Sequence, residues 1–289
     1  MLPTPGDHAM DLRDGRTLGF SVYGDPSGSP VINCHGGLLS GHDVSPADDL
    51  AGSLGVCIIS PDRPGIHRTS RLPAHGLLPW VEADLVPLLD YLELGTIGVM
   101  GWSEGGQYAL AASFALAERV TKCAVLAGCP PLDNPETFKE LNRIDHALAV
   151  LARRSPVAVR TVAAGTRQLA RRAPGMLMRS SLRGQPVAEI ASVKEQGRWL
   201  PTTLGEGAAN SRGVVDEYRA FVAPWGFGPG DLSAPVRIYQ GTADPLVPES
   251  WGHLLADRIP TASLALFPAE GHFIALTRRR EVLEWLLEI

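Results

Sequence analysis

The sequence predicts an α/β fold with a mostly parallel sheet and helices on both of its faces. Short apolar runs typical of buried strands alternate with helical segments from residue 31 onward. Such alternation favours a parallel sheet, because each crossover places a helix over the sheet. Residues 131–230 interrupt the alternation without a convincing strand. We therefore expect a core domain of residues 1–130 and 231–289 and an inserted helical cap, or lid, of residues 131–230.

The elements of the core are expected in a simple order. A hairpin comes first, at residues 9–23, because Asp14-Gly15 tolerates the positive φ angles of a tight turn. Ser45-Pro46 predicts the start of a helix that Gly55 ends. Further strands are predicted at residues 31–34, 56–59, 96–100, 124–126, 236–239 and 264–267, and further core helices at 77–94, 107–117 and from 273 onward. Cap helices are predicted near residues 135–152, 155–172, 186–199 and 206–222.

Length and composition limit the classes of function. A chain of 289 residues buries an ample hydrophobic core without a disulfide or a metal. The net charge of -5 gives no argument for nucleic-acid binding. No apolar run approaches the roughly 18 residues that indicate a membrane span. The first residues show no basic segment followed by an apolar one, so we expect no secretion signal and a cytoplasmic protein.

The cysteines are predicted to be structural. Cys34, Cys57, Cys123 and Cys129 lie in or just beyond strand-like runs, and no Cys-x-x-Cys pair occurs. Free cysteine behaves as a small buried hydrophobic residue, with disulfides or a reactive thiol as the alternatives. We expect neither a metal nor a cofactor.

The run Gly101-Trp102-Ser103-Glu104-Gly105 follows a predicted strand and precedes a predicted helix. A serine with glycines two residues before and after it can stand on a sharp turn that projects its hydroxyl into a cleft. Serine is a weak nucleophile at neutral pH, so it needs a base, and the base needs a group that fixes its tautomer. Taken alone, the motif is only a hypothesis.

Two later polar groups supply the missing partners. His272 follows the last predicted strand and is the predicted base, and Asp244 follows the strand before it and is the predicted acid. The carboxyl ends of parallel strands lie along one edge of a sheet, so Ser103, Asp244 and His272 are expected to converge there. The alternatives are Asp133 as the acid and His67 or His75 as the base.

Acyl transfer also requires hydrogen-bond donors for the developing oxyanion. The amide of Glu104 belongs to the serine turn, and the second donor is most simply the amide of Gly37, with Leu38 as the alternative. We interpret His35 as a residue that buttresses this loop by hydrogen bonding. The candidate pocket residues are His35, Leu38, Trp102, Trp199 and Trp225.

The cap carries an uneven charge. Between His146 and Ala188 there are eight arginines and no acidic residue. We expect one helical face to carry Arg153, Arg160, Arg167 and Arg171, and the opposite side to carry Val159, Val162, Ala163, Leu169 and Ala170. Two interpretations stay open: a solvated outer face, or contact with an anionic substrate, lipid head group or partner.

These motifs together resemble the α/β-hydrolase superfamily, and they occur in its order: His35-Gly36-Gly37, Asp62-Arg63-Pro64-Gly65, Gly101 to Gly105, Gly241 to Asp244 and Gly271-His272. The resemblance covers the core and implies an eight-stranded, mostly parallel sheet with the cap over Ser103. Many relatives continue Asp-Arg-Pro-Gly with a second glycine and a serine. This chain has Ile66-His67-Arg68-Thr69-Ser70 there, which leaves the shape of the adjacent pocket open.

We therefore predict a serine hydrolase, most simply a carboxylesterase that acts on a small or medium, largely apolar acyl ester through an acyl-enzyme. Haloalkane dehalogenases and epoxide hydrolases, which are members of the superfamily that this chain resembles, carry aspartate at the corresponding position, so Ser103 argues against their reactions. A carbon-carbon bond hydrolase and an amino-terminal peptidase remain alternatives, although Leu38-Leu39 replaces the Pro-Gly usual in proline iminopeptidase-like enzymes. A ligand-binding receptor with a retained triad is the alternative from another class. The oligomeric state stays open.

Overall fold

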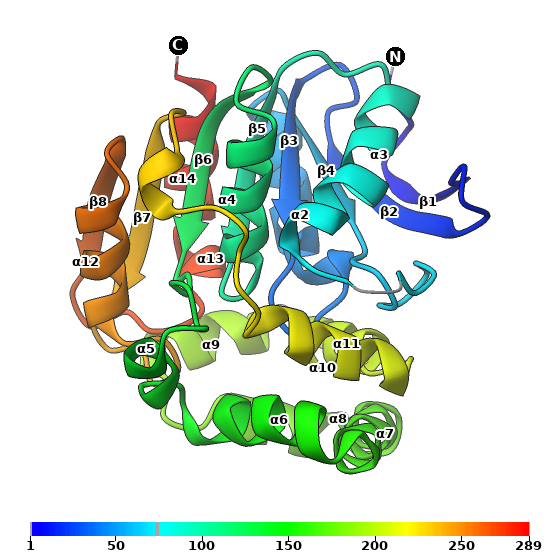
Figure 1. Cartoon of the computed structure of the whole chain (residues 1–289), viewed down its shortest axis with the longest axis vertical. Coiled ribbons are helices and arrows are strands. Elements are labelled where there is room, and N and C mark those ends of the chain that lie inside the picture. The colour runs from blue at the N-terminus through cyan, green and yellow to red at the C-terminus, as the bar shows by residue number, and fades with distance from the viewer. Residues whose placement is uncertain (1, 73–74, 289) are drawn as a thin grey trace.

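The computed structural model describes residues 2–72 and 75–288 and contains an eight-stranded sheet (Figure 1). The strand order is β1-β2-β4-β3-β5-β6-β7-β8. Strand β2 pairs antiparallel with β1 and β4, and all other neighbours are parallel, so the predicted mostly parallel sheet is confirmed. The strands are β1 (Gly6–Asp11), β2 (Thr17–Gly24), β3 (Ser29–Cys34), β4 (Val56–Pro61), β5 (Ile97–Trp102), β6 (Val120–Leu126), β7 (Val236–Gly241) and β8 (Ala262–Phe267).

Helices cover both faces of the sheet, as predicted. Neighbouring strand residues such as Val99 and Met100 enter different cores, because successive side chains in a strand point to opposite faces. The core containing Val99 is covered by α2 (Leu77–Trp80), α3 (Val86–Tyr91), α4 (Gly105–Ala115) and α12 (Glu249–Arg258). The core containing Met100 is covered by α1 (Asp48–Ser53), α13 (Ile274–Thr277) and α14 (Arg279–Leu287). Within the described ranges, no helix combines the length and apolar character needed to cross a bilayer.

The helix predicted at residues 77–94 contains an irregular turn. Helices α2 and α3 are joined by a π-helical turn, η2 (Val81–Leu85), which precedes Pro87. Proline has no N–H to offer the carbonyl of Ala83, four residues earlier. Arg16 donates to that carbonyl at 3.3 Å and pairs with Asp84 at 2.5 Å. A buried arginine from the hairpin therefore supplies the hydrogen bond that the proline cannot make.

The predicted helix start at Ser45-Pro46 is wrong. A 3-10 helix, η1 (Gly41–Ala47), begins after Ser40 and contains Pro46, and α1 follows at Asp48. The hydroxyl of Ser40 accepts the amide hydrogen of His42 at 3.3 Å and so caps the first turn. The capping signal was present in the sequence, five residues before the position we chose.

Seven α-helices lie between β6 and β7 and extend across the carboxyl ends of the strands (Figure 1). We call residues 135–221 the helical insert. Two predicted helices are each divided, because Asn142 and Asn210 cap new helices through their side-chain oxygens. The helix that begins at Pro174 and most of the helix that begins at Trp199 were not predicted. The insert contains α5 (Pro135–Lys139), α6 (Arg143–Arg154), α7 (Pro156–Arg172), α8 (Pro174–Ser181), α9 (Val187–Glu195), α10 (Trp199–Gly207) and α11 (Ser211–Phe221).

The insert contacts the core backbone to backbone at two glycines. A Cβ atom on Gly207 of α10 would lie 2.2 Å from the carbonyl oxygen of Leu38. A Cβ atom on Gly213 of α11 would lie 2.0 Å from the carbonyl oxygen of Gly65. Only glycine permits such approaches. The insert is therefore closely packed on the loops that follow β3 and β4.

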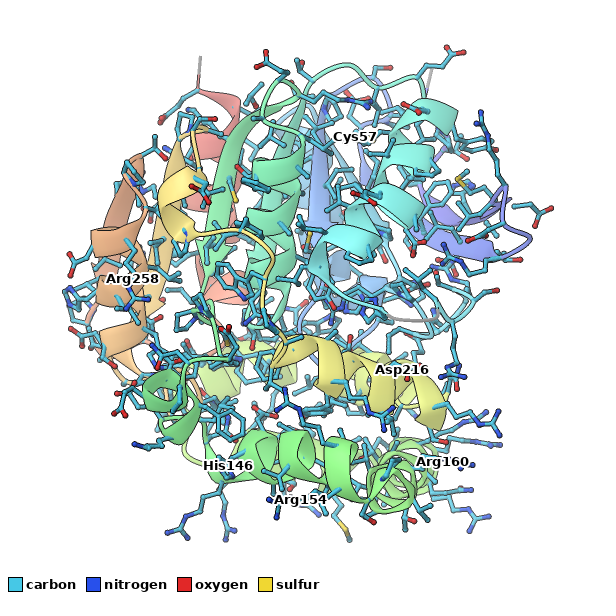
Figure 2. The ribbon with its side chains drawn as sticks, viewed as in Figure 1. Cys57, His146, Arg154, Arg160, Asp216 and Arg258 are labelled. Carbon is cyan, nitrogen blue, oxygen red and sulfur yellow. The ribbon has the colours of Figure 1, made fainter. Side chains whose placement is uncertain are left out.

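The eight arginines between His146 and Ala188 are exposed. Figure 2 shows Arg154 and Arg160 on the side of the insert away from the sheet. Arg153 belongs to α6 and donates to the carbonyl of Val222 at 3.0 Å, so it does not share a helix with Arg160. The apolar side of α7 is narrower than predicted, since Val162 and Leu169 are 48% and 38% exposed. Only the strip of α7 that packs against α10 and α11 is buried.

The four cysteines are buried and free, so none forms a disulfide. Burial raises the pKa of the Cys34 thiol to about 12, which keeps it protonated at neutral pH. A protonated, inaccessible thiol is a poor nucleophile. The burial of all four cysteines is typical of structural thiols, which is how we interpreted them from the sequence.

Candidate active site

Ser103 stands on a sharp turn between β5 and α4. Its φ angle is +57°, and its amide donates to the carbonyl of Leu126 at 2.8 Å. The flanking glycines are required by this turn. A Cβ atom on Gly101 would lie 2.2 Å from the carbonyl oxygen of Gly105, and one on Gly105 would lie 2.0 Å from that of Cys34. The strained turn presents Ser103 to a pocket between the sheet edge and the insert.

Asp244 and His272 are joined by a hydrogen bond of 2.8 Å between Nδ1 of the histidine and Oδ2 of the aspartate. The other carboxylate oxygen of Asp244 accepts from the amides of Leu246 and Val247 at 2.8 and 3.0 Å. The Asp244 side chain is fully buried. A carboxylate accepts hydrogen bonds, so Nδ1 of His272 carries the proton and Nε2 is left as the basic nitrogen.

The pKa of His272 reflects two opposed effects. Burial disfavours the charged imidazolium, but the charge of Asp244 and its hydrogen bond to the ring outweigh burial. Together they raise the pKa of His272 above its ordinary value of 6.5. The arrangement therefore stabilises an imidazolium, which is the form of the ring after it has accepted a proton.

Two residues of the insert hold the loop that carries His272, and the sequence analysis missed both. Glu189 of α9 accepts from the amides of Gly271 and Phe273 at 2.8 and 3.1 Å. Gln185 accepts from the amide of His272 at 3.1 Å. The partners are separated by more than 80 residues in the chain, so no local pattern signals the contact.

The loop after β3 is held by a buried arginine. The guanidinium of Arg63 is 1% exposed, pairs with Glu217 of α11 at 2.5 Å and donates to the carbonyls of His35 and Gly36. Both ring nitrogens of His35 are engaged, Nε2 by the amide of Arg63 and Nδ1 by the carbonyl of Gly36. Burial and the charge of Arg63 hold the pKa of His35 well below its usual value. His35 is therefore a neutral residue that fixes the loop.

Two backbone amides beside Ser103 are available to a ligand. Gly37 and Glu104 both line the pocket, and in the described part of the chain neither amide donates a hydrogen bond. The amide of Leu38, the alternative donor, instead points to Glu217 at 3.4 Å. The Glu104 carboxyl is itself buried against Gly37. Burial and the nearby Glu217 raise the pKa of Glu104 well above its usual value, which favours the neutral carboxyl.

The pocket has a volume of about 410 Å³ and is lined mainly by apolar side chains. Ser103 and His272 both line it, and Trp102 forms part of the wall beside them. The indole nitrogen of Trp102 donates to the carbonyl of His272 at 2.8 Å. Several apolar lining residues come from the insert or from the loops it contacts: Leu38, Leu141, Leu204, Phe221, Leu246 and Phe273.

The other two predicted tryptophans are placed differently. Trp199 lies behind Trp102, with ring centroids 6.4 Å apart, and its indole nitrogen donates to the carbonyl of Asp43 at 3.0 Å. Trp225 packs beside Phe227 in the apolar core on one face of the sheet. Among the described residues, neither Trp199 nor Trp225 lines the pocket of Ser103. The proposal of Trp225 as a pocket wall was wrong, because the chain has already left the insert at that residue.

The alternative acid and bases lie elsewhere. Asp133 is exposed, and in the described residues it makes no hydrogen bond to a histidine. His75 bonds to the hydroxyl of Tyr108 at 2.8 Å, and His67 packs against His42. None of these three residues lines the pocket that Ser103 and His272 share.

A family model described as the alpha/beta hydrolase fold matches residues 29–278, so the chain belongs to the α/β-hydrolase family. No curated protein sequence matched. Solved structures with a similar fold include an esterase from Exiguobacterium antarcticum, with 18% identity, coverage of 96% of this chain and 97% of that one, and a TM-score of 0.69.

Two further structures resemble the chain over nearly its whole length. The enol-lactonase from Burkholderia xenovorans shares 15% identity, with 97% of this chain and 98% of that one covered and a TM-score of 0.71. A bromoperoxidase from Bacillus anthracis shares 22% identity, with 98% of each chain covered and a TM-score of 0.72. At these identities the comparisons establish a common fold.

Proposed function

We propose that the protein is a serine hydrolase that cleaves carboxylic esters with a small or medium, largely apolar acyl group. One observation carries the proposal. A serine on a strained turn lines the same pocket as a histidine whose Nδ1 is bonded to a buried aspartate. An esterase and an enol-lactonase are among the structures that share this fold, so the fold is compatible with ester chemistry.

In the proposed mechanism, the hydroxyl oxygen of Ser103 attacks the ester carbonyl while Nε2 of His272 takes its proton. The amides of Gly37 and Glu104 stabilise the resulting oxyanion. The carbon-oxygen bond to the alcohol then breaks, and His272 returns the proton to the leaving alcohol. Water, activated by the same nitrogen, hydrolyses the acyl-enzyme and releases the acid. Asp244 holds the ring and stabilises the imidazolium throughout.

We further propose that residues 131–230 act as a lid domain over a core of residues 1–130 and 231–289. The insert supplies much of the apolar wall facing Ser103, including Leu141, Leu204 and Phe221. Apolar walls favour an apolar acyl or alcohol group, because its burial removes hydrocarbon surface from water.

The test is covalent labelling with a fluorophosphonate probe, followed by hydrolysis assays with p-nitrophenyl esters of increasing acyl length. We expect the probe to label the wild type but not Ser103→Ala, whose kcat/KM should fall by about 10⁴-fold or more. Ser181→Ala is the matched control. Ser181 also lines the pocket, but its hydroxyl is bonded to the carbonyl of Leu177, so labelling should persist.

Labelling of Ser103→Ala at another residue would contradict the proposed nucleophile. Among substrates, faster turnover of aminoacyl amides than of esters would assign an amino-terminal peptidase instead. Preferred turnover of vinylogous diketones would assign a carbon-carbon bond hydrolase. A labelled protein that turns over no substrate would indicate a ligand-binding receptor.

A further inference from the structure

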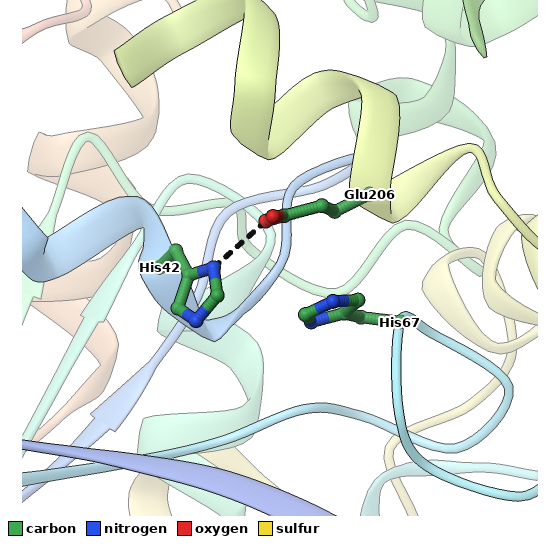
Figure 3. Close-up of side chains that lie close together, drawn as sticks. All are labelled: His42, His67 and Glu206. Atoms are coloured by element: carbon green, nitrogen blue, oxygen red, sulfur yellow. Dashed lines mark hydrogen bonds and ion pairs between the residues drawn. The ribbon is translucent and has the colours of Figure 1, made fainter. Parts of the chain in front are cut away.

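A cluster of potential metal-binding side chains lies at the interface between the insert and the core. His42 comes from η1, His67 from the loop after β4, and Glu206 from α10 of the insert (Figure 3). One ligand atom of each residue lies within 4.8 Å of the others. Nδ1 of His42 is 2.9 Å from Oε2 of Glu206, and the two imidazole rings are 5.1 Å apart.

Neighbouring groups orient two of these side chains. The second ring nitrogen of His42 lies 2.8 Å from a carboxylate oxygen of Asp7, which fixes the ring plane. The hydroxyl of Ser40 donates to Glu206 at 2.6 Å. The donor atoms of His42 and Glu206 are thus already held toward each other. The two side chains are 20% and 23% exposed, so a small ion can reach them from solvent.

Two properties of His67 bear on ligand binding. Its φ angle is +44°, a conformation that non-glycine residues seldom adopt. Its Nδ1 atom is buried and lies 3.4 Å from the carboxylate of Asp62, an ion-pair distance. A strained backbone has a cost in free energy, and such strain concentrates at ligand sites.

Two imidazoles and one carboxylate are a donor set typical of Zn²⁺, which leaves the fourth tetrahedral position to water. Ligands placed about 2.1 Å from zinc lie about 3.4 Å apart. The His42 and Glu206 donors, 2.9 Å apart, would therefore separate by about 0.5 Å, and donors as far as 4.8 Å apart would approach by about 1.4 Å, both within reach of side-chain rotation. Asp7 and Asp62 stand behind the two rings, where carboxylates commonly orient metal-binding histidines. Arg68 pairs with both of these aspartates, so Glu206 is the carboxylate left facing the rings.

From this geometry we infer that His42, His67 and Glu206 form a binding site for a divalent transition-metal ion of the zinc class. In the described residues, none of the three lines the pocket of Ser103, so the site is separate from the proposed chemistry. Its effect would be structural. Glu206 precedes Gly207, which packs on the carbonyl of Leu38, so the ion would fasten the insert to the core beside the oxyanion loop.

The test is zinc binding by the purified full-length chain after treatment with a chelator. Competition with a chromophoric chelator should give one equivalent of bound Zn²⁺, and thermal unfolding should shift upward by several degrees at saturating zinc. Co²⁺ in place of zinc should give the intense visible absorption of a tetrahedral site. These readouts need no ester substrate and are independent of the proposed hydrolase activity.

Two variants remove a ligand while preserving the local structure. His67→Asn deletes the imidazole and tolerates the positive φ angle, and Glu206→Gln keeps an oxygen acceptor for Ser40. Each should weaken zinc binding by about 10- to 100-fold or more and abolish the thermal shift. His253→Gln is the matched control, because His253 also contacts a glutamate, Glu249, but on an exposed helix surface.

Three outcomes would overturn the inference: no stoichiometric zinc binding by the wild type, unchanged affinity in both ligand variants, or an equal loss in His253→Gln. If His67→Asn does not fold, Glu206→Gln alone decides between the expected loss and unchanged affinity.

Discussion

At the scale of single residues, the hydrogen bond between Asp244 and His272 predicts how the hydrolase activity depends on pH. In the proposed mechanism His272 acts as a base only when it is neutral, and Asp244 raises its pKa above 6.5. We expect kcat/KM for an uncharged p-nitrophenyl ester to rise with pH to a plateau, with its midpoint above 6.5. Below the midpoint, kcat/KM should fall about tenfold for each unit of pH, because a proton occupies Nε2 of His272. A pH-rate profile measures this directly.

Asp244→Asn should move that midpoint in the opposite direction. The variant loses the charge that raises the pKa, while burial, which lowers it, remains. The midpoint should therefore fall, and the plateau rate should drop by about 10⁴-fold because the tautomer of His272 is no longer enforced. Asp133→Asn is the control and should leave both values unchanged. A midpoint that stays in place or rises in Asp244→Asn would contradict the assigned pair.

Sequence patterns predicted some residues of the candidate site and missed others. Ser103, Asp244 and His272 each follow a strand of a parallel sheet, so their meeting at one edge follows from general geometry. Glu189 and Glu217 are different. Each is one acidic residue on a helix of the insert, and only the three-dimensional packing of that insert brings it to a loop of the core.

At the scale of elements, the ion pair between Arg63 and Glu217 joins the loop after β3, which contains His35 and Gly36, to α11. Both side chains are 1% exposed. Arg63→Met would leave a buried carboxylate without its partner, and we expect the free energy of unfolding to fall by about 3–5 kcal/mol. The double variant Arg63→Met/Glu217→Leu should recover a large part of this loss, because no isolated charge remains. Denaturant unfolding measures both effects.

The control for this pair is Arg71→Met. Arg71 and Asp216 also join the core to α11, at 2.6 Å, but the arginine side chain is 44% exposed. Removing an exposed pair should cost only about 0–1 kcal/mol. Equal losses in Arg63→Met and Arg71→Met would show that the buried pair does not hold the insert to the core.

The sequence predicted the approximate positions of most helices but not the irregular turns and breaks within them. The π turn before Pro87 depends on Arg16, a residue of the hairpin far away in sequence, which compensates for the missing N–H. The breaks at Asn142 and Asn210 depend on side-chain caps that compete with helix continuation. The spacing of hydrophobic residues identifies the apolar face of a helix, but it does not locate the ends that such side-chain caps determine.

At the scale of the molecule, the parallel sheet followed from the alternation of strand and helix, whereas the arrangement of the insert did not. A parallel strand buried on both faces has a nearly continuous apolar sequence, which is readily recognised. The insert packs through small residues such as Gly207 and Gly213, whose role depends on which backbone they meet. That information is absent from the local sequence.

The exposed arginines of α7 give a prediction about charge. Arg160, Arg167 and Arg171 are exposed, and none forms an ion pair within the described residues. The triple change to glutamine lowers the net charge from -5 to -8, since three positive charges are lost. We expect turnover of an uncharged ester to change by less than about twofold and stability by about 0.5 kcal/mol or less.

Steady-state kinetics with an uncharged and an anionic ester of equal acyl length separate the two interpretations of this surface. Similar KM values in the wild type and the variant for both esters indicate a solvated face. An increase in KM confined to the anionic ester would show that the arginines contact substrate.

The residues that secure the two loops beside Ser103 have a consequence for protein engineering. Glu189, Gln185 and Glu217 all belong to residues 131–230 rather than to the sheet-bearing core. A chimera that exchanges this segment for that of a homologue replaces the acceptors for the amides of residues 271–273 and the counter-ion of Arg63. If the proposed mechanism holds, such a chimera should displace His272 and Gly37 unless these three positions are transferred with the segment.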